Sequence, residues 1–262
     1  MEIKDYLTNF YEHYDEDGRL LSKCGMVEYI TTMKYIEKYL QPGMRILEIG
    51  AATGRYSHAL ARKGYQVDAL ELVEHNIEIF KQNTIEGEPV TITQGNAIDL
   101  SKFESNTYDI VLLLGPMYHL FTKEDKVKAM SEAIRVAKKK GVVFTAYCMG
   151  DASVLCYGFI RGEIYNIIEK CMLNTETFDT FSNPWDIFEL HRKEDIDKLH
   201  SEFNVSQLHF IASDGYTNHM RNTVENMDDR MYELYLKYHL AVCERPDMVG
   251  YSHHTLDIFR KE

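Results

Sequence analysis

The stretch at 44–57, MRILEIGAATGRYS, decides the fold of this chain. Its apolar residues, interrupted by Glu48, predict a buried strand. Gly50 and Gly54 then predict a tight turn into a helix, because glycine adopts backbone angles that other residues avoid. A ligand can lie against such a turn, and the helix start offers it unpaired N–H groups and a positive dipole end. The stretch therefore predicts a site for a nucleotide-like ligand.

Two kinds of ligand compete for this turn. A dinucleotide site favours G-x-G-x-x-G, but Ala52 and Arg55 stand where its second and third glycines belong. The pattern E-x-G-x-x-x-G of Glu48, Gly50 and Gly54 instead resembles the first motif of the class I S-adenosylmethionine-dependent methyltransferases. This resemblance implies that the acid and the glycine turn surround the methionine half of the cofactor. The alternative is a plain strand-to-helix turn without a ligand.

A second strand is predicted at 65–71 and ends in an acid. The helix before it stops at Gly64, as a C-terminal glycine predicts. Glu71 follows Gly50 by 21 positions, and an acid at about this distance is placed to accept hydrogen bonds from both ribose hydroxyls. Dinucleotide enzymes share this spacing, so Glu71 predicts adenosine binding without choosing the cofactor. A helix N-cap or a solvent-exposed acid is the alternative.

A third strand is predicted where apolar and polar residues alternate at 90–93, and a turn follows it. In the methyltransferase family this turn usually carries an Asp that meets the adenine amino group, and Asn96 occupies that position here. Its amide oxygen can still accept from the amine, and Asp99 is a nearby alternative. Either residue can also be an ordinary turn former.

Five apolar residues at 110–114 predict a central parallel strand that is covered on both faces. Tyr118 and His119 follow at its carboxyl end, where open α/β sheets bind ligands. The phrase LGPMYHL at 114–120 resembles the bacterial small-molecule branch of the family. His119 is the candidate catalytic base because imidazole titrates near neutral pH. A structural histidine bonded to backbone is the alternative, and the phenol of Tyr118 is less suited to the role of base.

The order of these elements predicts an α/β protein with a Rossmann-like, doubly wound sheet. A helix at 125–140, whose last turn holds the basic cluster 138–140, and a fifth strand at 142–147 extend the pattern. The resemblance implies seven strands, mostly parallel, with a sixth at 206–211 and an antiparallel seventh at 255–260 beside the fifth. The predicted organisation is a helical N-terminal lid at 1–40, a methyltransferase core at 41–149 and 205–262, and a helical, aromatic insertion at 150–204 that caps the substrate.

The site residues come from all three parts. The predicted cofactor-binding residues are Glu48, Gly50, Ala51, Gly54, Tyr56, Glu71, Leu72, Asn96, Ala97 and Leu114 in the core, with Tyr14 and Arg19 in the lid. The predicted substrate contacts are Tyr118, Tyr157, Arg161 and Trp185. Arg19 can pair with a carboxylate on the cofactor or substrate, or merely with the acids beside it. Most aromatic residues of the insertion are expected to build its own core.

Composition and charge narrow the class of partner. Forty-one acidic against 29 basic residues give a net charge of −12, which argues against nucleic acid, whose binders present a basic face. The charged opening of the chain and the lack of a long apolar run argue against a signal peptide and a membrane span. Five scattered cysteines without C-x-x-C pairs predict reduced thiols and a cytoplasmic location. No metal is predicted, because the adjacent His253 and His254 are expected to point to opposite faces of a strand.

The function that the sequence predicts is methyl transfer from S-adenosylmethionine to a small molecule, with oxygen or nitrogen as the acceptor atom and S-adenosylhomocysteine as the product. The reaction is an in-line displacement, in which positioning of the acceptor supplies much of the rate. Two alternatives stay open: a nicotinamide-dependent oxidoreductase on a similar sheet, and a protein that binds S-adenosylmethionine without catalysis. The sequence indicates neither the acceptor molecule nor the oligomeric state.

Overall fold

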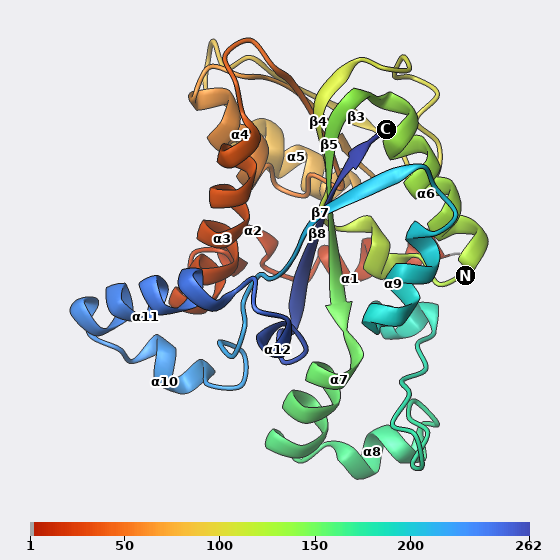
Figure 1. The fold of residues 1–262 in the computed structure, drawn as a ribbon, viewed down its shortest axis with the longest axis vertical. Coiled ribbons are helices and arrows are strands. Elements are labelled where there is room, and N and C mark those ends of the chain that lie inside the picture. The colour runs from red at the N-terminus through yellow and green to blue at the C-terminus, as the bar shows by residue number, and fades with distance from the viewer. Residues whose placement is uncertain (1–2) are drawn as a thin grey trace.

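The computed structural model describes residues 3–262, which form one central sheet with helices on both faces (Figure 1). Seven strands lie across the sheet in the order β3-β2-β1-β4-β5-β8-β7, and a short β6 pairs with the end of β5. The strands are β1 (Arg45–Ile49), β2 (Gln66–Glu71), β3 (Val90–Gln94), β4 (Tyr108–Leu113), β5 (Ala137–Met149), β6 (Leu190–His191), β7 (Val205–Ala212) and β8 (His254–Lys261).

Strand directions confirm the predicted Rossmann-like sheet. The first five strands pair in parallel, as crossover helices between them require. β8 runs antiparallel to both β5 and β7 and lies between them. The sheet therefore has the predicted antiparallel last strand. Beyond the seven expected strands it also contains β6, a short strand of two residues.

Helices bury the apolar side chains of both sheet faces. One face is covered by α3 (Lys23–Tyr39), α4 (Arg55–Arg62) and α5 (Glu74–Asn83), and the other by α6 (Lys123–Val136) and α9 (Lys193–His200). On the first face Ile36 and Leu60 pack in one cluster with Phe144 of β5. On the second face Met130 and Ile196 belong to another cluster. Each of these five side chains is at most 1% exposed, so burial of apolar area stabilises both layers.

The predicted helix at 125–140 is wrong at its C-terminal end. α6 ends at Val136, and the basic residues at 138–140 belong to β5. The Lys138 ammonium donates to both carboxylate oxygens of Asp109, at 2.8 Å each, and Lys140 pairs with Glu262. Lys138 and Lys140 therefore pair with acids in or beside the neighbouring strands, and the three lysines do not lie at a helix end.

The remaining helices gather at the carboxyl edge of the parallel strands. They are α1 (Ile3–Tyr11), α2 (Glu16–Arg19), η1 (Pro116–His119), α7 (Gly150–Ser153), η2 (Val154–Ile160), α8 (Ile164–Glu169), η3 (Pro184–Asp186), α10 (Arg221–Glu225), α11 (Asp229–Val242) and α12 (Pro246–Val249). The insertion predicted at 150–204 does not form one continuous helix, because Gly162 adopts a φ of +80° between η2 and α8. In Figure 1, α7 and α8 extend below the sheet, and α10 and α11 project to the left.

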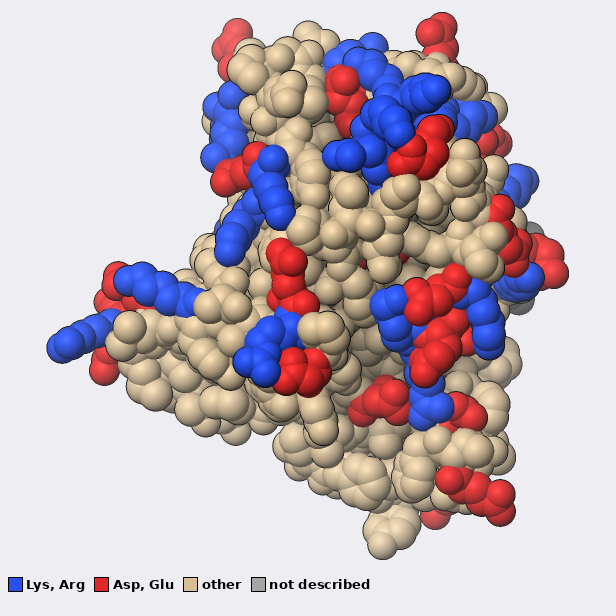
Figure 2. Space-filling view, viewed as in Figure 1, with Lys and Arg blue, Asp and Glu red and all other residues tan. Residues whose placement is uncertain are grey.

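Charge on the surface is mixed. On the face shown in Figure 2, Lys and Arg side chains lie beside Asp and Glu, and the lower part is largely uncharged. The exclusion of nucleic acid as a partner stays a prediction. None of the described helices is both long and apolar enough to cross a membrane.

Candidate functional site

The glycine turn after β1 has the backbone geometry that its sequence predicts. Gly50 has a φ of +77°, and a Cβ added there would lie 2.7 Å from Cδ of Pro116. The N–H groups of Gly50 and Ala51 both donate to the carbonyl of Leu70, at 2.8 and 3.0 Å, which ties the turn to the end of β2. The turn is therefore closely packed against the loop after β4, and a larger residue at position 50 has no room.

Gly54 has a different role from the one predicted. It caps α4 with a φ of +91°, and a Cβ there would lie 2.6 Å from both the His58 ring and the Phe80 ring. Gly54 allows α4 to pack closely against α5, and it does not line the cavity beside the turn. Its contribution to cofactor binding stays a prediction.

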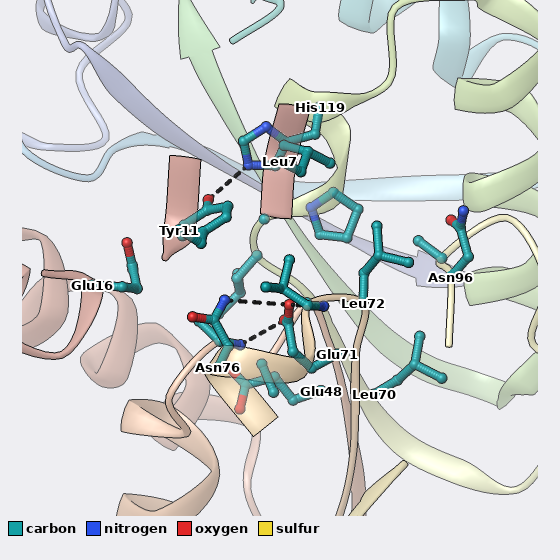
Figure 3. Close-up of a pocket in the computed structure, with 18 of the residues that line it drawn as sticks. Leu7, Tyr11, Glu16, Glu48, Leu70, Glu71, Leu72, Asn76, Asn96 and His119 are labelled. Atoms are coloured by element: carbon teal, nitrogen blue, oxygen red, sulfur yellow. Dashed lines mark hydrogen bonds between the residues drawn. The ribbon is translucent and has the colours of Figure 1, made fainter. Parts of the chain in front are cut away.

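Glu71 is held rigidly at the end of β2. Its Oε2 accepts from the Ala52 N–H at 2.9 Å, and its Oε1 accepts from the Val73 N–H at 2.9 Å and from the Asn76 amide at 3.4 Å (Figure 3). The side chain is 6% exposed, and burial raises the pKa of its carboxyl although these donors oppose the shift. A carboxylate accepts about four hydrogen bonds, so Glu71 keeps capacity for a hydroxyl in the cavity.

Glu48 lies beneath the glycine turn. It is 2% exposed and accepts a hydrogen bond from the hydroxyl of Ser57, in the first turns of α4. Burial raises the pKa of Glu48 to about 8. The carboxyl group is therefore largely protonated near neutral pH and can donate a hydrogen bond as well as accept one.

These groups meet in a first cavity of about 230 Å³ at the carboxyl ends of β1, β2 and β4. It brings together most of the predicted cofactor residues, and Tyr118 and His119 with them. Those that line it are Arg19, Glu48, Gly50, Ala51, Tyr56, Glu71, Leu72, Asn96, Ala97 and Leu114. Apolar side chains beside Glu71, among them Leu70, Val73 and Ile98, form a surface on which a purine can pack.

Asn96 is already used by the turn that carries it. Its side-chain oxygen accepts from the Ile98 N–H at 3.2 Å, so the amide stabilises the loop after β3. One lone pair of this oxygen and both amide N–H groups remain for a ligand. The structure thus places Asn96 at the cavity, and its adenine contact stays a prediction.

His119 is neutral and has both ring nitrogens occupied. Nδ1 lies 2.8 Å from the Ile187 carbonyl, so it must carry the proton, and Nε2 accepts from the Tyr11 hydroxyl at 2.9 Å. Burial lowers the pKa of His119 to about 4. The predicted role of His119 as a base that contacts substrate stays a prediction, and Figure 3 shows the Tyr11 hydroxyl hydrogen-bonded to its ring.

A second, larger cavity of about 840 Å³ adjoins the first. Four residues line both cavities, and we call them the shared wall: Tyr11, Glu16, Arg19 and Tyr118. Aromatic residues from α1, from the turn after it and from the insertion line the second cavity, namely Phe10, Tyr14, Tyr157, Phe181 and Phe188. The two cavities therefore meet across one short boundary made by the N-terminal helices and η1.

A row of alternating charges, here called the ionic chain, crosses the second cavity to the shared wall. Asp214 Oδ2 lies 2.7 Å from His254 Nδ1, and the same nitrogen lies 3.6 Å from Glu28 Oε2. Arg19 donates to that Glu28 oxygen at 2.8 Å and to Glu16 at 3.1 Å. Burial opposes the charge of His254, yet the Glu28 and Asp214 carboxylates raise its pKa well above the usual value. Both cations of the chain are thus balanced by acids.

Several predicted residues lie away from the first cavity. Tyr14 stacks on Phe10 and lines the second cavity, so the structure does not place it beside the other cofactor residues. Tyr157 also lines the second cavity, and its contact with a substrate stays a prediction. Arg161 lies 4.2 Å above the Tyr157 ring and Trp185 is 61% exposed, and neither lines either cavity.

Sequence reasoning missed the rest of the second cavity. The sequence predicts no site role for Tyr11, Glu16 or Glu28, and it predicts His254 to be no metal ligand. His254 reaches the site because it pairs with Cys148 at the end of β5, which places it at the carboxyl edge of the sheet. No local pattern signals contacts between residues more than 200 positions apart.

His253, His254 and Asp214 lie together, contrary to the expectation that the two histidines diverge. His253 precedes β8, so strand alternation does not apply to it, and candidate ligand atoms of the three residues lie within 4.8 Å of one another. The Asp214 oxygens already accept from Ser252, from Asn218 and from the backbone and ring of His254. These hydrogen bonds account for the cluster without a cation, and the absence of a metal stays a prediction.

Comparison with known proteins identifies the class. A family model described as "Methyltransferase domain" matches residues 47–145. The chain carries a class I S-adenosylmethionine-dependent methyltransferase domain, and S-adenosylmethionine is the cofactor of this class. The glycine turn, the anchored Glu71 carboxylate and the apolar surface beside it fit that cofactor.

Individual relatives are distant. The Bacillus subtilis protein YqeM, which is named provisionally as a methyltransferase, is 27% identical over 110 residues, which are 42% of this chain and 44% of that protein. Demethylmenaquinone methyltransferase of Staphylococcus epidermidis is 27% identical over 150 residues, 54% and 58% of the two chains. A methyltransferase structure from Methanosarcina mazei has a TM-score of 0.56 at 17% identity and covers 87% and 96%. The chain thus spans about half the length of the curated relatives it matches.

Proposed function

We propose that this protein transfers the methyl group of S-adenosylmethionine to a small molecule that binds in the second cavity. One observation carries the proposal: a cavity with a bare glycine turn and an anchored carboxylate meets a larger cavity across the four residues of the shared wall. A methyl donor in the first cavity and an acceptor in the second would approach each other only there. Holding two reactants in such proximity supplies much of the rate in a displacement.

Each part of the first cavity has a proposed role. Glu71 would accept from the ribose hydroxyls, and Gly50 with Ala51 would leave room for the methionine half beside Glu48. Arg19 has N–H groups beyond those given to Glu16 and Glu28, and these can bind a carboxylate. When bound, the cofactor supplies an activated methyl group on a positively charged sulfur. Leu72, Ala97, Leu114 and Tyr56 would enclose it.

A small acceptor agrees with the enclosure and charge of the second cavity. Its lining includes six Asp or Glu side chains against three from Lys and Arg, which disfavours a polyanion such as nucleic acid. The Staphylococcus epidermidis relative is likewise named for a small molecule, demethylmenaquinone. Oxygen or nitrogen is the proposed acceptor atom, and Tyr118 and Tyr157 are the proposed contacts. His119 would take up a proton through Tyr11 where the acceptor is a hydroxyl.

Two measurements test this proposal. Calorimetry with S-adenosylhomocysteine and with NAD should show tight binding of the first and none of the second. Incubation with methyl-labelled S-adenosylmethionine and a fractionated cell extract should then label a small metabolite. Tighter binding of NAD would favour an oxidoreductase, and cofactor binding without any labelled product would favour a binding protein. The five cysteines are free, in keeping with the proposed cytoplasmic location.

A further inference from the structure

We propose that the methyl acceptor is an amine, whose nitrogen is held at the shared wall by the Glu16 carboxylate and the phenol oxygens of Tyr11 and Tyr118. The inference rests on the proposed function and names its substrate class. An acceptor atom must reach from the second cavity to the boundary with the first, so the groups of the shared wall are the ones that contact it. Their chemistry therefore decides which acceptor fits.

The hydrogen-bonding groups of the shared wall favour a substrate that donates hydrogen bonds. The Tyr11 hydroxyl donates a hydrogen bond to His119 at 2.9 Å, and the Tyr118 hydroxyl donates one to the Leu114 carbonyl at 2.9 Å. Both phenol oxygens can therefore only accept further hydrogen bonds. Glu16 accepts from Arg19 through Oε1, and its other oxygen has no partner among the described residues. The shared wall thus offers three hydrogen-bond acceptors to the atom that is methylated, and an amine carries enough N–H groups to bond to them.

The charge around this wall favours a cation. Glu16 and Glu28 share the single guanidinium of Arg19, and His254 lies between Glu28 and Asp214. The ionic chain therefore begins and ends with a carboxylate. Burial raises the pKa of Glu16, which shows that its charge is poorly solvated there. An ammonium group beside Glu16 would stabilise the buried carboxylate charge, whereas an anionic substrate would destabilise it.

Aromatic faces complete a site for an ammonium group. Phe10 and Tyr14 stack with ring centres 4.9 Å apart, and Phe188 lies 5.8 Å from Phe10 and 5.9 Å from Tyr118. The faces of such rings attract cations. A methylated ammonium product would gain more from these faces than an ether would, because an ether carries no charge. The second cavity thus combines the two features that recognise amines, acids and aromatic rings.

The reaction balances with the groups present. An ammonium acceptor first gives one proton to the Glu16 carboxylate, which regenerates the nitrogen lone pair. That nitrogen forms a bond to the methyl carbon while the carbon–sulfur bond of the donor breaks and its electron pair stays on sulfur. The positive charge moves from sulfur to nitrogen, Glu16 releases to solvent the proton that it accepted, and the methylated product leaves as an ammonium ion. No oxidant, reductant or metal is needed.

The test compares three probes of similar size on the protein saturated with S-adenosylhomocysteine: 2-phenylethylamine, 2-phenylethanol and 3-phenylpropanoate. Calorimetry should show that the amine binds at least about tenfold more tightly than the other two. Glu16→Gln should abolish that preference, measured at a concentration of S-adenosylhomocysteine that saturates the variant. Glu12→Gln, which removes an exposed carboxylate from the neighbouring turn, is the matched control and should keep the preference.

The outcomes separate the two proposals. An alcohol or carboxylate that binds as tightly as the amine, or no binding of any probe, overturns the amine assignment. Failure of S-adenosylhomocysteine to bind the wild-type protein overturns the proposed function, and the amine assignment with it. If Glu16→Gln does not fold, the comparison of the three probes on the wild-type protein decides the question alone.

Discussion

Replacement of Glu71 by Ala tests the ribose assignment most directly. Three donors hold the carboxylate, and one full acceptor position stays open, with a second where the Asn76 bond is long at 3.4 Å. Glu71→Ala therefore removes one strong and one weaker charge-assisted hydrogen bond to the ribose. At about 1.5–3 kcal/mol for such a bond, we expect a loss of about 2–4 kcal/mol. The Kd for S-adenosylhomocysteine should rise about 30- to 1000-fold.

The same substitution also affects folding, so binding and stability are measured separately. Loss of the acceptor leaves the Ala52 and Val73 N–H groups to water, which costs about 1–2 kcal/mol of stability. Urea unfolding gives this figure, and calorimetry below the unfolding transition gives the Kd. Glu74→Ala is the matched control, because it removes an exposed carboxylate three residues later. A folded Glu71→Ala protein whose Kd stays within about threefold of wild type would refute the ribose assignment.

Four further outcomes are expected. Gly50→Ala should lose both stability and affinity for S-adenosylhomocysteine, because its Cβ would meet Pro116. Gly64→Ala has a similar positive φ of +90° but open space around it, so it should lose only about 1–2 kcal/mol of stability in urea unfolding. Equal losses of stability in the two variants would rule out the Pro116 contact. Because the folded pKa of Glu48 is about 8, stability should fall as pH rises from about 4.5 to 8, and unfolding of Glu48→Gln should lack this slope. Because the folded pKa of His119 is about 4, stability should instead fall as pH drops from about 6.5 to 4, and a His119→Gln variant that keeps the full slope would contradict the assigned burial. A chelator should leave the affinity for S-adenosylhomocysteine unchanged; a measurable drop would point to a bound cation.

The first cavity could be predicted from sequence because its parts are local. Glu48, Gly50 and Glu71 each stand at the end of a strand whose apolar pattern is strong, and parallel strands bring their carboxyl ends to one edge. The prediction of a helix end at 138–140 was wrong because a run of lysines is compatible with both a helix end and a strand. Lysines at 138–140 suit a helix end, yet the pairing of Ala137 with Tyr108 draws the segment into β5.

The second cavity could not be predicted in this way. Its ionic chain joins Glu16, Arg19 and Glu28 from the N-terminal helices to Asp214 and His254 near the far end of the sequence. Which acid meets which cation depends on how α2 and α3 lie over the ends of β5 and β8. Patterns of period 2 or 3.6 report which face of an element is buried, and they carry no information about such a meeting.

The position of β8 sets an order in which the sheet can be completed. β8 is synthesised after β5 and β7 but lies between them and bonds to both. Until it emerges from the ribosome, two strand edges stay unpaired and open to other chains. A nascent protein would therefore benefit from a chaperone during this interval. Cleavage between α12 and β8 would leave a molecule that keeps its glycine turn but loses His253 and His254 from the lining of the second cavity.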